Sequence, residues 1–301
     1  MKIFITGASG LIGSALVSEL QGRGDMVLLA RRDPKEPCGP SDVEWNTNTG
    51  EFDTAKLRGL DAVVHLGGTS IGAHRWNGQV KARISESRIS GTRQVVKMLA
   101  AKFDNPVRFL SASAIGFYGD RGEERLEETA TSGAGYLSSL VSEWEREAKG
   151  AEAARHSVAL LRSGIVLDKH GGALQKQLTL FKLGAGAILG SGNQWMSWIH
   201  LKDEVAAIIF LLENPHITGA VNLVAPEPVR NRDYSHQLGN SFSKPVLLKA
   251  PAFALKAALG AEMATELLLS SQRVVPTVLS NAGFRYNFAG LKDALANLVT
   301  S

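Results

Sequence analysis

The chain has 301 residues, of which 44% are hydrophobic and 21% charged, and its formal net charge is +4. These values are typical of a soluble globular protein with a sizeable core, and no run of lysine and arginine is long enough to predict a nucleic-acid-binding arm. Cys38 is the only cysteine, which excludes an intramolecular disulfide.

The first residues lead directly into a glycine-rich segment, so we expect no signal peptide. No apolar run reaches the length that crosses a bilayer. We therefore expect a cytoplasmic protein without a membrane partner.

Short apolar runs alternate with longer amphipathic segments through the first half of the chain. Buried strands are predicted at residues 2–6, 26–30, 62–66, 107–111 and 158–162. Helices are predicted at residues 11–21, at 80–103 with a break near Ser90 and Gly91, and at 137–154. Strands separated by helices predict an α/β fold with a Rossmann-type, doubly wound parallel sheet.

The pattern changes after about residue 167, where glycine-rich loops begin. A helix at 202–213 and a strand at 220–224 are predicted to return to the sheet, so the dinucleotide-binding domain would comprise residues 1–167 and 200–225. Residues 168–199 and 226–301 are predicted to form a smaller, mostly helical C-terminal lobe on the substrate side.

Three glycines follow the first strand with the spacing of a dinucleotide-binding loop. Gly7 permits the turn off the strand, Gly10 lets the backbone approach a pyrophosphate, and Gly13 lets the next helix pack closely. That helix would present free N–H groups to the phosphates. The predicted cofactor loop comprises Gly7, Ser9, Gly10, Leu11, Ile12 and Gly13.

The end of the second strand predicts which dinucleotide binds. NAD sites place an acidic residue there, whereas this strand ends in Arg31 and Arg32. Two guanidinium groups can hold a 2′-phosphate by charge-assisted hydrogen bonds, which favours NADP(H); the alternative is a solvated pair of surface arginines.

Further motifs resemble a known family. They are TGASGLIG at 6–13, DAVVHLGG at 61–68, SAS at 111–113 before Tyr118, LRSGIVL at 161–167, WIH at 198–200, NLVAP at 222–226 and QRV at 272–274. Nearly the whole chain is similar to the atypical, extended short-chain dehydrogenase/reductases of the NAD-dependent epimerase/dehydratase family. Within it, the chain resembles the YfcH-type epimerase family proteins, often labelled cell-division inhibitor SulA homologues.

The resemblance implies further site residues. Leu66 and Gly67 should lie beside the adenosine part of the cofactor, and Arg88 should reach a cofactor phosphate. Ser111 and Ser113 should lie at the nicotinamide end.

Hydride-transferring members of the superfamily use a serine together with a Tyr-x-x-x-Lys pair on one helix, where the lysine lowers the pKa of the tyrosine. Ser113 and Tyr136 match the first two, so they are the predicted catalytic residues. Leu140 stands where the lysine is expected. Packing alone could explain Ser113, and Tyr136 could be an ordinary aromatic residue at a helix start. Tyr118 is a rival proton donor.

Two functions remain open. The first is an NADP(H)-dependent oxidoreductase or epimerase acting on a small hydroxyl or carbonyl substrate such as a nucleotide sugar. The second is a non-catalytic NADP(H) sensor, linked to cell division. The sequence predicts no metal site, because no cluster has metal-ligand spacing. It also predicts no nucleic-acid partner. Among oligomeric states, we consider a homodimer.

Overall fold

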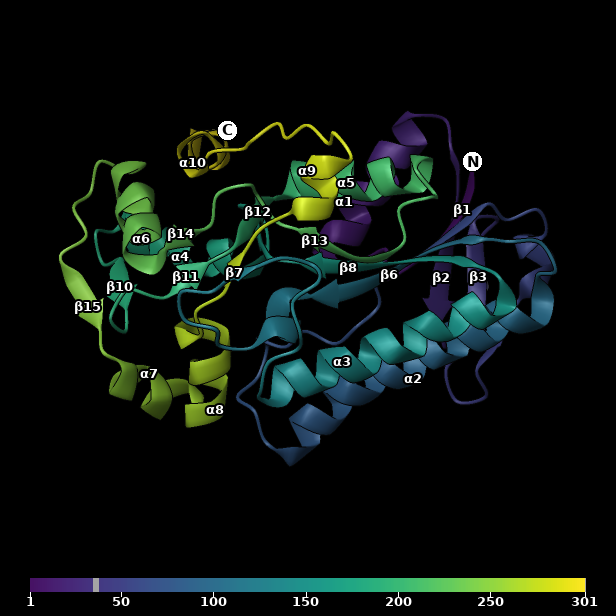
Figure 1. The fold of residues 1–301 in the computed structure, drawn as a ribbon, viewed down its shortest axis with the longest axis horizontal. Coiled ribbons are helices and arrows are strands. Elements are labelled where there is room, and N and C mark those ends of the chain that lie inside the picture. The colour runs from purple at the N-terminus through teal and green to yellow at the C-terminus, as the bar shows by residue number, and fades with distance from the viewer. Residues whose placement is uncertain (35–37, 301) are drawn as a thin grey trace.

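An eight-stranded sheet runs through the larger part of the protein in the computed structural model, which describes residues 1–34 and 38–300 (Figure 1). All neighbouring strands are parallel except the last pair, which is antiparallel. The strand order is β13 (Gly219–Leu223), β8 (Ser157–Ser163), β6 (Arg108–Ala114), β5 (Ala62–His65), β1 (Lys2–Thr6), β2 (Met26–Arg32), β3 (Asp42–Asn46) and β4 (Glu51–Phe52). The predicted Rossmann-type sheet is therefore confirmed.

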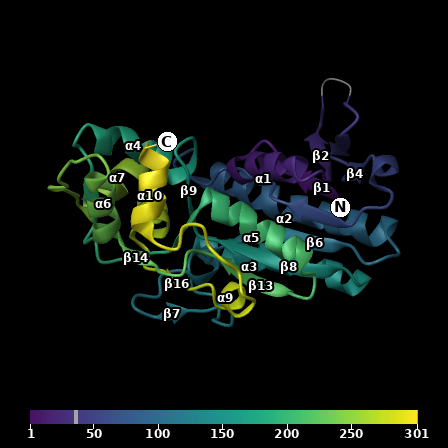
Figure 2. The ribbon, with the colours of Figure 1, turned by 90° about the horizontal axis from the view of Figure 1, so that it is seen from above.

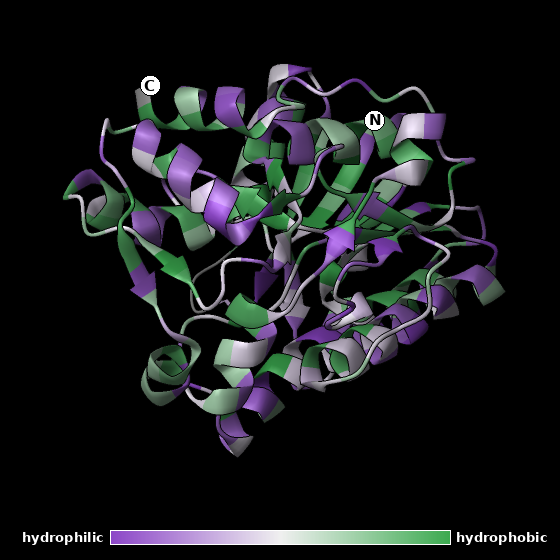
Figure 3. Cartoon of the chain, turned by 60° about the vertical axis from the view of Figure 1, so that its left-hand side comes forward, coloured by the Kyte–Doolittle hydropathy of each residue, from purple (hydrophilic) through white to green (hydrophobic). Residues whose placement is uncertain are grey.

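Two helical layers cover the sheet. Helices α2 (Gly78–Lys102) and α3 (Tyr136–Lys149) lie together on one face, and α1 (Leu11–Gly22) and α5 (Leu201–Glu213) lie on the other (Figures 1 and 2). Side chains alternate along β1, so that Phe4 packs toward α2 while Ile3 and Ile5 pack toward α1 and α5. Because both faces are buried, the central strands are mostly apolar, as Figure 3 shows by their green colour.

The structure corrects the sequence prediction at two places. Helix α2 continues through Ser90 and Gly91, where a break was expected. Gly91 is buried and faces Trp45, so tertiary packing offsets the cost of a glycine inside a helix. The prediction also missed β3, where Val43 and Trp45 alternate with polar residues and bury their side chains.

A second lobe lies at the left of Figure 1, beyond the carboxyl ends of the strands. Its apolar core contains Trp198, Tyr234 and Leu295. Its elements are α4 (Gly172–Lys182), β10 (Ala187–Leu189), β11 (Trp195–Met196), β14 (Val229–Arg230), α6 (Asn231–Asn240), β15 (Leu248–Ala250), α7 (Ala252–Leu259), α8 (Ala261–Ala264), a π-helical turn (Thr265–Leu269) and α10 (Leu291–Thr300).

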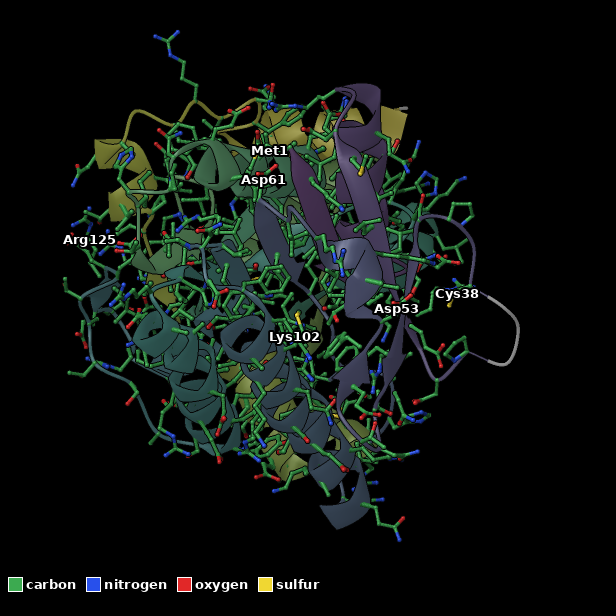
Figure 4. The ribbon with its side chains drawn as sticks, turned by 90° about the vertical axis from the view of Figure 1, so that its right-hand side faces the viewer. Met1, Cys38, Asp53, Asp61, Lys102 and Arg125 are labelled. Carbon is green, nitrogen blue, oxygen red and sulfur yellow. The ribbon has the colours of Figure 1, made fainter. Side chains whose placement is uncertain are left out.

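Short ribbons join the lobe to the sheet domain. Strand β9 (Ile165–Leu167) pairs with β12 (Trp198–His200), and β7 (Arg125–Leu126) pairs with β16 (Arg273–Val274), which is followed by α9 (Thr277–Asn281). The opposite, amino edge of the sheet carries the labelled Met1 and Asp61 (Figure 4), where the Asp61 carboxylate accepts a hydrogen bond from the Lys2 amide.

Candidate functional site

The glycine loop at the end of β1 has a backbone that only glycine permits. Gly7 has a φ of +75°, and a Cβ atom built on it would lie 2.7 Å from the Leu66 carbonyl carbon. A Cβ atom on Gly13 would lie 2.2 Å from the Gly7 oxygen. The loop is therefore pressed against the end of β5 and the start of α1, where side chains have no room.

The outer surface of the same loop is open. Ser9 and Gly10 are exposed, and Gly10 is the N-cap of α1 without any side-chain cap. The first amide groups of α1 therefore have no side-chain acceptor from the cap residue, and they lie at the positive end of the helix dipole. This is the geometry of an anion-binding helix N-terminus.

Cations surround this loop. Arg31 is 60% exposed at the end of β2, with its Nε atom 3.7 Å from an Asp42 oxygen. The Arg32 guanidinium lies 5.3 Å from the centre of the Trp45 ring. The two arginines leave opposite faces of the strand, since successive side chains alternate.

Arg88 on α2 is a third cation at the same edge. It donates to the Thr69 carbonyl at 2.8 Å and lies 5.2 Å from the centre of the Trp144 ring. Burial lowers the pKa of Arg88 to about 10, so it stays charged at neutral pH. No carboxylate within residues 1–34 and 38–300 forms an ion pair with Arg88, which leaves its charge available to an anionic ligand.

A buried polar chain lies beneath the loop and fixes the ends of β1 and β5. The His65 ring contacts Thr6 Oγ1 at 2.6 Å through Nδ1 and Thr92 Oγ1 at 3.0 Å through Nε2. Trp144 donates to the same Thr92 oxygen at 2.8 Å. Burial, followed by the charges of Arg32 and Arg88, lowers the pKa of His65 to about 3. A neutral His65 therefore positions the loop, and the two arginines contribute to a common positive field.

Residues that follow β5 and β9 form the other walls. Leu66 and Gly67 come directly after β5, where the Leu66 backbone contacts Gly7. Gly171 lies so close to Leu11 that an added Cβ atom would be 2.8 Å from its Cδ1 atom. Lys176 on α4 donates to the Gly72 carbonyl at 2.9 Å. The second lobe thus contacts both the glycine loop and the loop that follows β5.

The predicted catalytic serine lies in the interior. Ser113 is only 6% exposed, and its hydroxyl donates to Glu145 Oε1 at 2.6 Å. Arg162 donates to both oxygens of the Glu145 carboxylate, at 2.7 and 2.8 Å. Ser111 is fully buried, and its hydroxyl donates to the neighbouring Ala112 carbonyl at 3.3 Å. To reach a substrate, the Ser113 hydroxyl would first have to leave Glu145.

Tyr118, the rival proton donor, belongs to the same interior network. Its hydroxyl donates to Asn222 Oδ1 at 2.7 Å and accepts from Arg162 Nη1 at 2.9 Å. Burial raises the pKa of Tyr118. Tyr118 therefore stabilises the interface between β8 and β13.

The predicted catalytic tyrosine occupies a different position. The Tyr136 hydroxyl donates to the Lys81 carbonyl at 3.0 Å and lies 3.2 Å from the Ser85 hydroxyl. The Trp76 ring packs edge-on against it, with centres 5.1 Å apart. Ser113 and Tyr136 therefore each have partners of their own rather than sharing one.

The π-helical turn of the second lobe holds the start of α3. Both oxygens of the Glu266 carboxylate accept backbone N–H bonds, from Tyr136 at 2.8 Å and from Leu137 at 2.7 Å. Leu140, at the expected lysine position, is 4% exposed and packs with Val80 and Ile84 of α2.

Sequence reasoning missed Glu145, Arg162, Glu266 and Lys176 as residues that organise the site. Glu145 could have been identified from the sequence, because it lies on the same helix face as Val141 and Trp144, and that face is buried. A carboxylate on such a face needs an ionic partner. The partners of Glu266 and Lys176 lie more than 100 residues away, and no local pattern reveals them.

Two cavities lie elsewhere. A groove of about 760 Å³ runs between α1, α5 and residues 283–298, and a pocket of about 450 Å³ lies beside Trp195 and Arg273. None of the predicted site residues lines either one. These two cavities therefore give no support to the predicted site, whereas the glycine loop and the cations do.

Residues 1–34 and 38–300 contain neither a metal-ligand cluster nor a membrane-spanning helix. No group of three histidine, cysteine, aspartate or glutamate side chains among these residues could hold a metal ion. No helix among them is both long and apolar enough to cross a membrane.

Comparison with known proteins gives two family matches. Residues 3–223 match the model of the NAD dependent epimerase/dehydratase family, and residues 250–298 match a domain of unknown function, DUF1731. The second match covers α7, α8, the π-helical turn that carries Glu266 and most of α10.

Similar proteins extend over the full chain. Epimerase family protein Mb2239 of Mycobacterium bovis is 38% identical over 298 residues, covering 99% of this chain and 97% of that protein. The crystal structure of human epimerase family protein SDR39U1 (isoform 2) with NADPH superposes with a TM-score of 0.89 at 28% identity, covering 100% and 99% of the two chains. A nucleoside-diphosphate sugar epimerase from Corynebacterium glutamicum has a TM-score of 0.81 at 30% identity, covering 99% of this chain and 58% of its own.

Proposed function

The chain belongs to the NAD dependent epimerase/dehydratase family, and we propose that it binds NADP(H) and acts as an oxidoreductase or epimerase on a small hydroxyl or carbonyl substrate. The observation that carries this proposal is the glycine loop with its surrounding cations. Side chains are excluded at Gly7 and Gly13, while Arg31, Arg32 and Arg88 supply positive charge at the same edge.

The residues present fit a dinucleotide. The α1 amide groups beside Ser9, Gly10, Leu11 and Ile12 would hold the pyrophosphate, and Leu66 and Gly67 would lie against the adenosine. Arg31 and Arg32 would hold a 2′-phosphate, and Arg88 another phosphate oxygen. When bound, the nicotinamide supplies or accepts the hydride.

Support for NADP(H) rather than NAD(H) comes from two directions. The second strand ends in two arginines instead of an acidic residue. The structure of the human relative, SDR39U1, contains NADPH. The C. glutamicum relative is described as a nucleoside-diphosphate sugar epimerase, which supports a nucleotide sugar as substrate.

On the substrate side we propose Ser113 and Tyr136, with Ser111 lining the nicotinamide end. Ser113 would polarise the substrate oxygen once its hydroxyl leaves Glu145, and Tyr136 would donate or accept the proton. Trp76 and Glu266 would hold Tyr136 in position.

A second candidate is a non-catalytic NADP(H) sensor. One observation favours it: Leu140 replaces the expected lysine and is packed in the apolar contact between α2 and α3. The cation that activates the tyrosine is thus missing from that position. The cofactor site supports both candidates equally.

Titration calorimetry of cofactor-stripped protein with NADPH and NADH tests NADP(H) binding, which both candidate functions share. We expect NADPH to bind at least tenfold more tightly, because about 1.4 kcal/mol of charge-assisted bonding to the 2′-phosphate corresponds to tenfold in affinity. Equal affinities would refute the assignment. A fluorescence assay of NADPH oxidation with carbonyl compounds and nucleotide sugars then separates the candidates, because only the enzyme turns over.

A further inference from the structure

Five large apolar side chains are exposed together at the outer end of the second lobe. They form what we call the outer patch: Leu180, Leu183, Leu247, Leu248 and Phe253. Leu247 is 83% exposed, Phe253 76% and Leu183 75%. Among the described residues only Met1 and Met26, at the other end of the molecule, are comparable. Large apolar residues gathered in this way mark an interaction surface.

The five residues lie on three neighbouring segments: the end of α4 with the turn after it, β15 with the residue before it, and α7. The turn after α4 closes with a hydrogen bond from the Ala185 amide to the Leu180 carbonyl, 2.8 Å long. Two residues later Ala187 of β10 pairs with Leu248 of β15. Helix α7, which carries Phe253, begins directly after β15 (Figures 1 and 3).

Helix α7 is only partly covered, because Ala252, Leu255 and Leu259 are half-buried and its other residues are exposed. Its sequence is AFALKAAL, in which Lys256 is the only polar residue, yet none of its residues is buried. An apolar helix in a folded chain normally packs one side against a neighbour. In α7 the packed side is only half-buried, and Phe253 is 76% exposed.

The formally charged residues within the segments that carry the patch are all lysines, and the nearest acidic residues along the chain on either side of β15 and α7 are Asp233 and Glu262. Lys182, Lys244, Lys249 and Lys256 are exposed in the same segments. Residues 169–202 and 234–261 contain no aspartate or glutamate, although 29 acidic residues among 301 would place about six in stretches of this length. Within the described ranges, none of the four lysines forms an ion pair.

We propose that the outer patch docks on an anionic lipid surface. Phe253 and the leucines would enter the headgroup region, and the four lysines would contact lipid phosphates. This peripheral contact requires no spanning helix. It differs from the expectation, drawn from the sequence, that the protein has no membrane partner. It does not depend on the proposed cofactor.

Shape and charge favour a lipid surface over another protein. The apolar side chains protrude from a two-stranded ribbon and an exposed helix, and both cavities described above are lined by other residues. A fluid interface accepts such a protruding surface, whereas a protein partner needs a complementary one. A second copy would bring four lysines against four lysines.

Co-sedimentation of the full chain with vesicles tests the proposal. We expect binding to phosphatidylcholine vesicles that contain about 30% phosphatidylglycerol, little binding to pure phosphatidylcholine, and release at about 0.5 M salt, because screening weakens the lysine contacts. Lys249→Gln with Lys256→Gln should weaken the partition coefficient by about tenfold or more. Phe253→Ser with Leu247→Ser should weaken it similarly.

The matched control is Lys97→Gln with Lys102→Gln, which removes the same charge from α2; Lys102 lies at the opposite end of the molecule (Figure 4). This variant should bind like the wild type. Absence of binding to the anionic vesicles, or an equal loss in the control, would overturn the proposal. So would a dimer in light scattering that dissociates in the Phe253→Ser, Leu247→Ser variant, since the patch would then join two copies. Circular dichroism melts establish that each variant is folded.

Discussion

The hydroxyl of Ser113 donates a 2.6 Å hydrogen bond to the carboxylate of Glu145, which lies 32 residues later on α3. This contact ties the end of β6 to a buried ion pair between Glu145 and Arg162. The serine that the sequence assigns to catalysis is thus also an interior structural residue, and its two roles predict different mutant behaviour.

If Ser113 polarises the substrate, Ser113→Ala should lower turnover by about 100-fold or more, while NADPH affinity changes less than about twofold. Steady-state kinetics and calorimetry measure the two effects. Ser139→Ala serves as the control, because the Ser139 hydroxyl is exposed and donates to the carbonyl of Gly135, the N-cap of α3. Unchanged turnover in Ser113→Ala would leave Ser113 with the interior role alone.

Breaking the buried ion pair should be costly. Glu145→Gln leaves the Arg162 charge uncompensated at 4% exposure, so we expect the free energy of unfolding to fall by about 3 kcal/mol or more in urea denaturation. Glu145→Gln combined with Arg162→Met should recover part of that loss. A double variant less stable than Glu145→Gln alone would show that the ion pair is not the source of the effect.

The cofactor assignment predicts a selective loss. Arg31→Ala with Arg32→Ala should weaken NADPH binding by about 100-fold, roughly tenfold for each lost charge-assisted contact, and NADH binding by less than about threefold. Arg58→Ala with Arg146→Ala removes the same charge elsewhere, since Arg58 adjoins Lys2 at the amino edge of the sheet. Equal losses of affinity for the two cofactors would show that the 2′-phosphate does not bind at the end of β2.

Restoring the missing lysine should not repair the Tyr-x-x-x-Lys pair. Leu140→Lys places an ammonium group among Val80, Ile84 and Leu137, and we expect it to lower the free energy of unfolding by about 2–4 kcal/mol without raising turnover. Leu140→Met, which keeps the apolar volume, should cost less than about 1.5 kcal/mol. A stable Leu140→Lys protein with faster turnover would contradict this reading of the α2–α3 contact.

A buried carboxyl group predicts a pH dependence of stability. Glu204 on α5 accepts a hydrogen bond from the Ser163 hydroxyl through Oε1, and burial raises the pKa of Glu204 from 4.5 to about 8. The protonated form is favoured in the folded state, so its contribution to stability is full below pH 4.5 and is lost as the pH rises through about 8. Glu204→Gln should therefore gain stability relative to the wild type between pH 5 and pH 8.5, by about 2 kcal/mol or more.

Urea denaturation of both proteins at the two pH values measures this difference. Glu86→Gln, at an exposed position on α2, should leave the wild-type pH dependence unchanged. A difference between wild type and Glu204→Gln that does not vary with pH would assign Glu204 an ordinary pKa.

Local sequence patterns predicted much of the fold. The strands at β1, β2, β5, β6 and β8 follow from short apolar runs that are buried on both faces, and Gly7, Gly10 and Gly13 predict the loop after β1. The family resemblance, carried by motifs along the chain, is confirmed by the match over residues 3–223. These features could be read because each depends on residues within a few positions of one another.

The partners of the predicted catalytic residues could not be read in this way. The sequence alone places Ser113, Tyr136 and Leu140 at the spacing of a family motif, and it predicts the α/β class and the cofactor loop. Only the tertiary structure joins Ser113 to Glu145, Tyr136 to Lys81 and Glu266, and Leu140 to the core of the α2–α3 contact. Strands and turns arise from short-range periodicity and backbone preference, whereas the environment of a side chain depends on which distant segments pack against it.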